Sequence, residues 1–151
     1  MRSKLVSRRA ALALAAFVAI VLVPAIKYPP TPPAVGLHET VRLRTAAYFA
    51  MLALSVAAAT LALLSYRRLA GRIAGLDRLL IAIGIYAATV ALVQRLLPVI
   101  DEVPARFPAT LLWQFRLAAI GTQALFWLVA ADLFGRAAER TVRNGHRRVA
   151  R

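Results

Sequence analysis

Two short polar stretches carry the side chains of this sequence that could bind a metal ion. They are His38-Glu39 and Asp101-Glu102, one imidazole and three carboxylates in a chain with six acidic residues and two histidines. First-row divalent cations accept both kinds of ligand. Adjacent acids cannot both face one ion from a helix, and the sequence has no His-x-x-x-His pair. His38, Glu39, Asp101 and Glu102 are therefore candidate metal ligands that the fold would have to bring together.

The same acids have a simpler use as partners of nearby arginines. Charged side chains beside an apolar segment are stabilised by an opposite charge. The pairs expected on this interpretation are Glu39 with Arg42, and Asp101 and Glu102 with Arg95, Arg106 or Arg116. The sequence alone leaves both interpretations open.

Four apolar segments determine where these polar stretches lie. They cover residues 10–26, 46–65, 79–100 and 111–134. A helix needs roughly 20 apolar residues to cross a hydrocarbon core about 30 Å thick. The hydrophobic fraction of 61% and the mean hydropathy of +0.68 also exceed what a soluble chain of this length could bury. We predict one all-α domain over residues 1–151, a polytopic transmembrane helical bundle with four membrane-spanning helices.

The basic residues predict the orientation of these helices. Fourteen of the twenty Lys and Arg residues lie before the first segment, between the second and third, or after the fourth. Basic residues near the ends of spans are retained in the cytoplasm. Both termini are therefore predicted to be cytoplasmic, and the loops 27–45 and 101–110 to lie outside. Because the net charge of +14 collects at the ends of apolar segments, we expect anionic lipid headgroups, and no nucleic acid, as its partners.

The first segment also resembles a signal peptide. Basic residues precede it, and Val23-Pro24-Ala25 resembles a small-residue cleavage site, so residues 1–25 could be a secretory or twin-arginine signal. Cleavage would leave three spans and place the two most basic remaining connections on opposite sides. Retention of the segment fits the charges better.

The sequence has no motif of a known enzyme class. It lacks cysteine, a phosphate-binding glycine loop, a nucleophile elbow and a zinc-protease helix. The two histidines, His38 and His146, lie on opposite sides of the predicted membrane. We expect no enzymatic activity and no resident cofactor.

Both outer loops contain several prolines within long, unusual strings. Four prolines within residues 29–33 exclude a helix and favour an extended stretch, whereas Pro108 is well placed at the start of the fourth helix. The strings in the first loop are Lys27-Tyr28-Pro29-Pro30, Pro32-Pro33-Ala34-Val35-Gly36, Glu39-Thr40 and Arg44-Thr45. Those in and after the second loop are Glu102-Val103-Pro104-Ala105, Phe107-Pro108-Ala109, Leu111-Leu112-Trp113, Phe115-Arg116-Leu117-Ala118 and Gly121-Thr122-Gln123-Ala124. Together they resemble the CbtA family of cobalt transporter subunits over roughly residues 24–139.

This resemblance implies a multi-pass protein of the bacterial inner membrane that takes part in cobalt uptake. It also implies a small single-span partner subunit of the CbtB type, and it makes cobalt or another divalent cation the transported substrate. It supplies no metal ligands. Family members usually have further hydrophobic sequence upstream, and commonly an acidic residue where this chain has Leu37-His38. These departures predict a shortened member of the family.

The fourth apolar segment contains several polar side chains, and such groups need a partner within a membrane. Arg116 and Gln123 are seven residues apart, so they share one helical face. The other members of that face are Trp113, Ile120 and Trp127. We predict that this face is buried, and that Arg116 reaches an acid of the second outer loop.

Spacing within the segments predicts further contacts. Asp132 and Arg136 are four residues apart, so a local ion pair is expected. Small residues at spacing four permit close helix packing. They are Ala53, Ala57, Ala58 and Ala62 in the second segment, Gly84 and Ala88 in the third, and Ala118 and Thr122 in the fourth. We predict a compact bundle.

Two functions of different classes fit these features. The first is an integral membrane subunit of an uptake transporter for cobalt or another divalent cation. The second is a non-transporting assembly or anchor subunit that packs against a partner membrane protein. Because four helices are few to enclose a path, we expect a partner subunit or a homo-oligomer in the first case.

Overall fold

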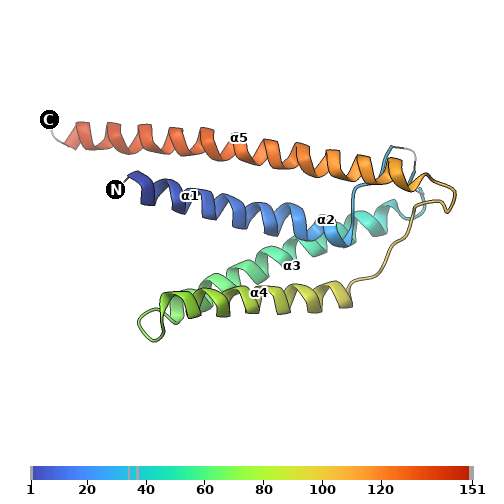
Figure 1. Ribbon diagram of the computed structural model, residues 1–151, viewed down its shortest axis with the longest axis horizontal. Coiled ribbons are helices and arrows are strands. Elements are labelled where there is room, and N and C mark those ends of the chain that lie inside the picture. Colours follow the sequence, from blue (N-terminus) through green and yellow to red (C-terminus); the bar gives the residue numbers. More distant parts are fainter. Residues whose placement is uncertain (1, 34, 37, 150–151) are drawn as a thin grey trace.

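Helices make up nearly all of the described structure. The computed structural model describes residues 2–33, 35–36 and 38–149, and the side chains of residues 10–33, 35–36, 38–138 and 140. Its helical elements in chain order are α1 (Arg2–Phe17), a π-helical turn η1 (Val18–Leu22), α2 (Val23–Lys27), α3 (Val41–Arg68), α4 (Gly75–Leu96) and α5 (Ala109–Val149) (Figure 1). No strand occurs in these residues.

Four stretches of helix are long and apolar enough to cross a membrane, as the sequence predicts. They are Ala10–Lys27, Val41–Arg68, Gly75–Leu96 and Ala109–Ala138. One predicted boundary is wrong, because the third helix ends at Leu96 and not at residue 100. Leu97 precedes a proline and is extended, with ψ of 144°, since the proline ring disfavours the helical conformation of the residue before it.

The two ends of the bundle carry different parts of the chain. The N-terminus, the C-terminus and the turn between α3 and α4 lie at one end, which we call the terminal end (Figure 1). The connections 28–40 and 97–108 lie at the other, which we call the loop end (Figure 1). The two terminal segments and the turn between α3 and α4 carry most of the basic residues, and all three therefore share the terminal end, as the charge pattern predicts.

The tightest packing lies between α3 and α4. The buried residues of α3 recur every three or four positions and so form one face. They are Ala47, Met51, Ser55, Ala58 and Ala62. The buried residues of α4 are Ala82 and Val90. Tyr86, which lies midway between them in the sequence, is partly buried and packs against the same core. This hairpin is the core that holds the rest of the molecule.

Only part of the predicted small-residue packing is present. Ala58 and Ala62 are buried in the α3 face. The remaining predicted positions are exposed, namely Ala53, Ala57, Gly84, Ala88, Ala118 and Thr122. In alanine-rich helices small residues occur on every face, so their spacing does not by itself choose the one that packs.

A π-helical turn interrupts the first span in the middle of the apolar segment. The N–H of Val23 donates to the carbonyl of Val18, five residues back, so the carbonyl of Ala19 would need the N–H of residue 24. That residue is Pro24, which has no N–H. The hydroxyl of Ser55 on α3 donates to the Ala19 carbonyl instead, at 2.7 Å. Val23 and Pro24, part of the string that resembles a cleavage site, are buried within α2.

The fourth span lies at the edge of the molecule. No residue is buried in the most apolar stretch of 18 residues within Ala109–Ala138. The helix α5 packs against α1 and η1 (Figure 1). The rings of Phe17 and Trp127 meet edge to face, with centroids 6.4 Å apart. Within one chain, the predicted burial of the Arg116 and Gln123 face is only partial, and the bundle is less compact than expected. Arg116, Ile120 and Trp127 are half-buried, whereas Trp113 and Gln123 are exposed. Too few helices are present to cover both sides of α5.

Candidate functional site

A buried ion pair joins the two connections at the loop end. Nη1 of Arg44, in the first turns of α3, lies 2.6 Å from Oε2 of Glu102 in the 97–108 connection. The Glu102 side chain is 3% exposed and that of Arg44 is 25% exposed. Water therefore screens this pair poorly, and each charge depends on the other.

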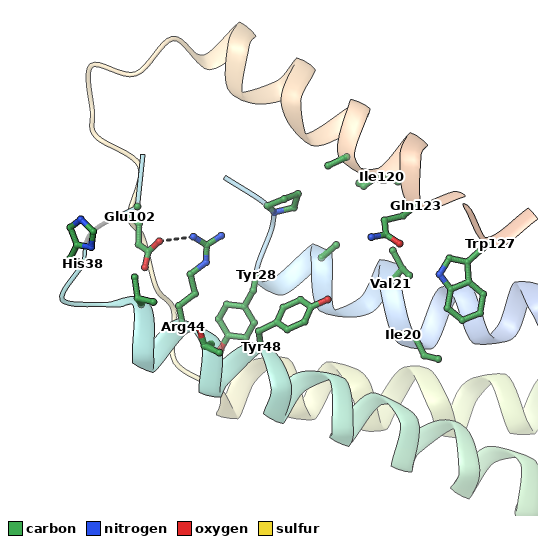
Figure 2. A pocket seen from close by; sticks show the side chains of 16 residues that line it. Ile20, Val21, Tyr28, His38, Arg44, Tyr48, Glu102, Ile120, Gln123 and Trp127 are labelled. Atoms are coloured by element: carbon green, nitrogen blue, oxygen red, sulfur yellow. Dashed lines mark hydrogen bonds and ion pairs between the residues drawn. The ribbon is translucent and has the colours of Figure 1, made fainter. Parts of the chain in front are cut away.

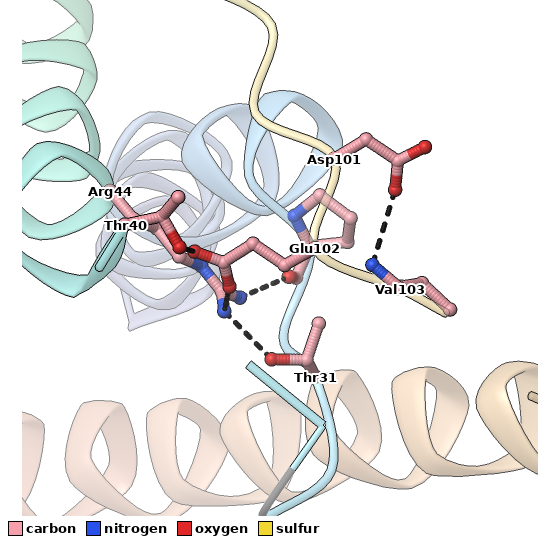
Figure 3. A network of polar contacts seen from close by, with 7 residues as sticks. Thr31, Thr40, Arg44, Asp101, Glu102 and Val103 are labelled. Atoms are coloured by element: carbon pink, nitrogen blue, oxygen red, sulfur yellow. Dashed lines mark hydrogen bonds and ion pairs between the residues drawn. The ribbon is translucent and has the colours of Figure 1, made fainter. Parts of the chain in front are cut away.

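The remaining donors and acceptors of the pair are also used. Arg44 donates from Nη1 to Oγ1 of Thr31 at 2.7 Å and from Nη2 to the carbonyl of Pro29 at 2.9 Å (Figure 3). The hydroxyl of Thr40 donates to Oε1 of Glu102 (Figure 3). Both carboxylate oxygens of Glu102 are thus hydrogen-bonded, and the proline-rich connection 28–40 is fixed to α3 and to the opposite connection.

Two more hydrogen bonds tie the end of α2 to the end of α4. Nζ of Lys27 donates to the carbonyl of Gln94 at 2.7 Å, and the hydroxyl of Tyr28 donates to the carbonyl of Pro98 at 2.8 Å. Tyr28 is 5% exposed, and this burial raises the pKa of its hydroxyl above the ordinary value of 10.0. The loop end is therefore held by polar contacts over long stretches of sequence.

The ion pairs expected from sequence are only partly correct. Glu102 pairs with Arg44 rather than with Arg95, Arg106 or Arg116. Asp101 is exposed and accepts the N–H of Val103 at its Oδ1, at 3.2 Å, which forms a local turn (Figure 3). Glu39 and Arg42 are both exposed, and no ion pair joins them in the described part of the chain. The expected pair of Asp132 with Arg136 is present, at 2.9 Å.

The four candidate metal ligands are not gathered round one point. Among the residues whose side chains are described, no three His, Cys, Asp or Glu residues lie close enough to hold one ion. His38 is exposed and Glu102 is buried, and both line one cavity. Glu39 and Asp101 do not line it. The cavity therefore brings together two candidates, His38 and Glu102, that lie far apart in the sequence.

This cavity lies at the loop end, between α5 on one side and η1, α2 and α3 on the other (Figure 2). Its volume is about 980 Å³, and it is partly open to the surroundings. The polar and aromatic side chains that line it are Tyr28, His38, Arg44, Thr45, Tyr48, Glu102, Gln123 and Trp127. Apart from the neutralised pair of Arg44 and Glu102, the lining combines neutral polar groups with aromatic rings.

The two intramembrane residues singled out in the sequence have different surroundings. Gln123 of α5 lines the cavity with its neighbours Ile120 and Trp127 (Figure 2). Arg116 is half-buried, and its Nε is shielded from solvent without a hydrogen-bond partner. It makes no ion pair with Asp101 or Glu102 in the described residues. The helical spacing correctly placed Gln123 beside Ile120 and Trp127.

Sequence reasoning missed the buried polar contact between three helices. Ser55 donates its only hydroxyl proton to Ala19, so Tyr86 of α4 must donate to Oγ of Ser55, at 2.9 Å. The signal was a proline inside an apolar segment, which leaves a carbonyl without its helical partner. It indicates that a donor is needed but not which residue supplies it.

The stretches that form the loop-end network are also those through which the sequence resembles a known family. The model of the family described as "Probable cobalt transporter subunit (CbtA)" matches residues 2–139, nearly the whole chain. The chain belongs to the CbtA family. No curated protein and no solved structure matches it.

Membership of the CbtA family agrees with the architecture. The family is described as a transporter subunit, and four helices of this CbtA protein are apolar and long enough to span a membrane. The chain is a multi-pass membrane protein. The word subunit also agrees with a fold in which one span, α5, has one side uncovered.

Proposed function

We propose that this chain is the integral membrane subunit of a cobalt uptake transporter in the bacterial inner membrane, with both termini in the cytoplasm. The cavity at the loop end is then the outward-facing part of the ion path. The observation that carries the proposal is this cavity, bordered by three spans of a chain that belongs to the CbtA family. Cobalt is the substrate and not a resident cofactor.

The size and lining of the cavity suit a hydrated cation. An ion with about six waters, each occupying roughly 30 Å³, fits within a volume of about 980 Å³. Burying a bare divalent charge in a membrane is costly, so a path that keeps water around the ion lowers the barrier. The amide oxygen of Gln123 and the rings of Tyr48 and Trp127 offer further weak attraction to a cation.

His38 is the side chain best placed to meet an ion first. It is exposed at the loop end and also lines the cavity, and imidazole nitrogen is a good ligand for cobalt. Glu39, next to His38 in the sequence, and Asp101, next to Glu102, are both exposed and would raise the local cation concentration without fixed coordination. Glu102 is not expected to bind the ion, because its two carboxylate oxygens already accept hydrogen bonds from Thr40 and Arg44.

The inside-negative membrane potential would favour entry of the ion. It contributes about 2.3 kcal/mol per charge for each 100 mV, and a divalent ion gains twice that amount. Since α5 lacks a neighbour on its outer side, a CbtB-like single-span subunit or a second copy of the chain would complete the wall of the path.

A second candidate function is supported by a specific observation. Because the described residues contain no cluster of three metal-binding side chains, the chain could serve as an assembly or anchor subunit that does not itself conduct the ion. In that case the cavity would receive part of a partner protein, and its polar lining would affect assembly but not transport.

Uptake of radiolabelled cobalt separates the two functions. Cells that express the chain with its candidate partner subunit are compared with cells that express either protein alone or an empty vector. Substitution Gln123→Leu removes an amide from the cavity, whereas Gln114→Leu makes the same change at an exposed position of α5 outside the cavity. We expect Gln123→Leu to lower the uptake rate about tenfold and Gln114→Leu to leave it within about twofold.

The control measurement is the amount of each variant that co-purifies with the partner. Normal assembly with reduced uptake supports the transport function. Equal uptake by both variants contradicts it, and loss of assembly in Gln123→Leu with unchanged uptake per complex favours the anchor function.

A further inference from the structure

Four arginines surround the turn between α3 and α4 at the terminal end. Arg67 and Arg68 close α3, Arg72 lies in the turn, and Arg78 lies in the first turns of α4. The segment contains one acid, Asp77. No carboxylate in the described part of the chain forms an ion pair with any of these arginines. Their charge is therefore left for an anion from outside the chain.

One of the four is held in place by an aromatic ring. The guanidinium carbon of Arg78 lies 4.4 Å from the centroid of the Tyr66 ring, and Nη2 donates to the Tyr66 hydroxyl at 3.2 Å. Nε of Arg78 is shielded from solvent and has no hydrogen-bond partner. A guanidinium that is already oriented loses less freedom when it binds a phosphate group than a free side chain does.

The apolar surroundings of this arginine indicate which molecule carries the anion. Exposed leucines flank the charged turn on both helices, among them Leu63 and Leu64 on α3 and Leu76 and Leu79 on α4. Arg78 and Tyr66 lie near the ends of two spans, where headgroup phosphates meet the hydrocarbon. A phospholipid can satisfy both surfaces at once, with its phosphate on the arginines and its acyl chains on the leucines. A nucleic acid or a free phosphate ion would leave the leucines uncovered.

We propose that the α3–α4 turn is a binding site for an anionic phospholipid of the cytoplasmic leaflet, centred on Arg78 and supported by Arg72, Arg67 and Arg68. The stacked Arg78 contacts the phosphate, and the three exposed arginines supply the preference for a lipid with net negative charge. The choice of leaflet rests on the orientation in the proposed function. Lipid binding itself does not depend on transport, because this site is at the opposite end of the molecule from the cavity.

Native mass spectrometry of the purified full chain in detergent tests the site, with phosphatidylglycerol as the probe and the zwitterionic phosphatidylcholine, which has no net charge, as the comparison. We expect phosphatidylglycerol to bind at least about tenfold more tightly. Substitution Arg78→Gln should weaken that binding about tenfold. Substitution Arg78→Lys keeps the charge but loses the stacked planar group, and should weaken binding about threefold.

The matched control is Arg140→Gln, which removes one positive charge from an exposed position on α5, downstream of the α5 span. It should change phosphatidylglycerol binding by less than about twofold. Equal losses in Arg78→Gln and Arg140→Gln would overturn the proposal, because they would mean that the attraction is diffuse. Displacement of the lipid by an equal concentration of inorganic phosphate would also overturn it. Circular dichroism of each variant establishes that the helices are intact.

Discussion

The two ends of this molecule use charge in opposite ways. At the loop end, Lys27, Arg44 and Glu102 are all held in hydrogen bonds that join distant parts of the chain. At the terminal end arginines are abundant, and the ion pair described there is the local one of Arg136 with Asp132. The charges of Lys27, Arg44 and Glu102 therefore hold distant parts of the fold together, whereas the arginines of the α3–α4 turn form no ion pair in the described residues and are available to meet lipid.

The largest expected effect of a single substitution tests this contrast directly. Glu102→Gln keeps the shape of the side chain but leaves the Arg44 guanidinium without its counter-charge. Removing one partner of a buried pair costs about 3 kcal/mol of unfolding free energy. The matched change at the terminal end, Asp132→Asn, breaks an exposed pair and should cost no more than about 0.5 kcal/mol.

Unfolding by sodium dodecyl sulfate in mixed micelles measures both values. Similar losses for Glu102→Gln and Asp132→Asn would contradict the distinction between the two ends. A double variant, Glu102→Gln with Arg44→Gln, should recover part of the loss, since no unpaired charge remains.

A smaller effect is expected at the centre of the membrane. Ser55→Ala leaves the carbonyl of Ala19 and the hydroxyl of Tyr86 without their partner, and should destabilise the protein by about 1 kcal/mol. The control is Ser65→Ala, because the Ser65 hydroxyl bonds only to the carbonyl of Leu61 on its own helix. The same micelle titration applies, and an unchanged midpoint for Ser55→Ala would mean that the π turn does not need its donor.

Sequence reasoning succeeded where one local property decides the structure. Hydropathy gave the four spans, and the distribution of arginine predicted that both termini and the turn after α3 lie at one end. The pair of Asp132 and Arg136 followed from their spacing on one helix. The end of α4 at Leu96 could also have been predicted, because Pro98 excludes a helical Leu97.

Sequence reasoning failed where distant segments choose among several partners. Glu102 has Arg95, Arg106 and Arg116 nearer in sequence, yet it pairs with Arg44, which is 58 positions away. The path of the proline-rich connection brings Arg44 to it, and that path is a property of the whole fold. The same reason explains why His38 and Gln123 could not be assigned to one cavity from their positions in the chain.

The smallest effect concerns the Tyr28 hydroxyl at the loop end. Tyr28→Phe removes its hydrogen bond to the Pro98 carbonyl and should cost about 0.5 kcal/mol near neutral pH. Because burial raises the pKa of Tyr28 above 10.0, the protonated form is favoured in the folded protein. This contribution is complete below pH 10 and is lost as the pH rises through the raised pKa.

Thermal unfolding of wild type and Tyr28→Phe between pH 8 and pH 12 measures this dependence. The other tyrosines are present in both proteins, so their ionisation does not contribute to the difference. The difference between wild type and Tyr28→Phe should narrow as the pH rises above about 10. A difference that widens with pH would mean that the buried hydroxyl is ionised in the folded protein.

Labelling of a single cysteine tests the central claim, that the cavity opens to the outside and receives the cation. The chain has no cysteine of its own, so Gln123→Cys carries the only thiol. A membrane-impermeant thiol reagent added to intact spheroplasts should modify Gln123→Cys, and cobalt should slow the modification. Ala70→Cys, in the turn after α3, should react only after the membrane is permeabilised. Labelling of Ala70→Cys but not Gln123→Cys in intact spheroplasts would contradict the account.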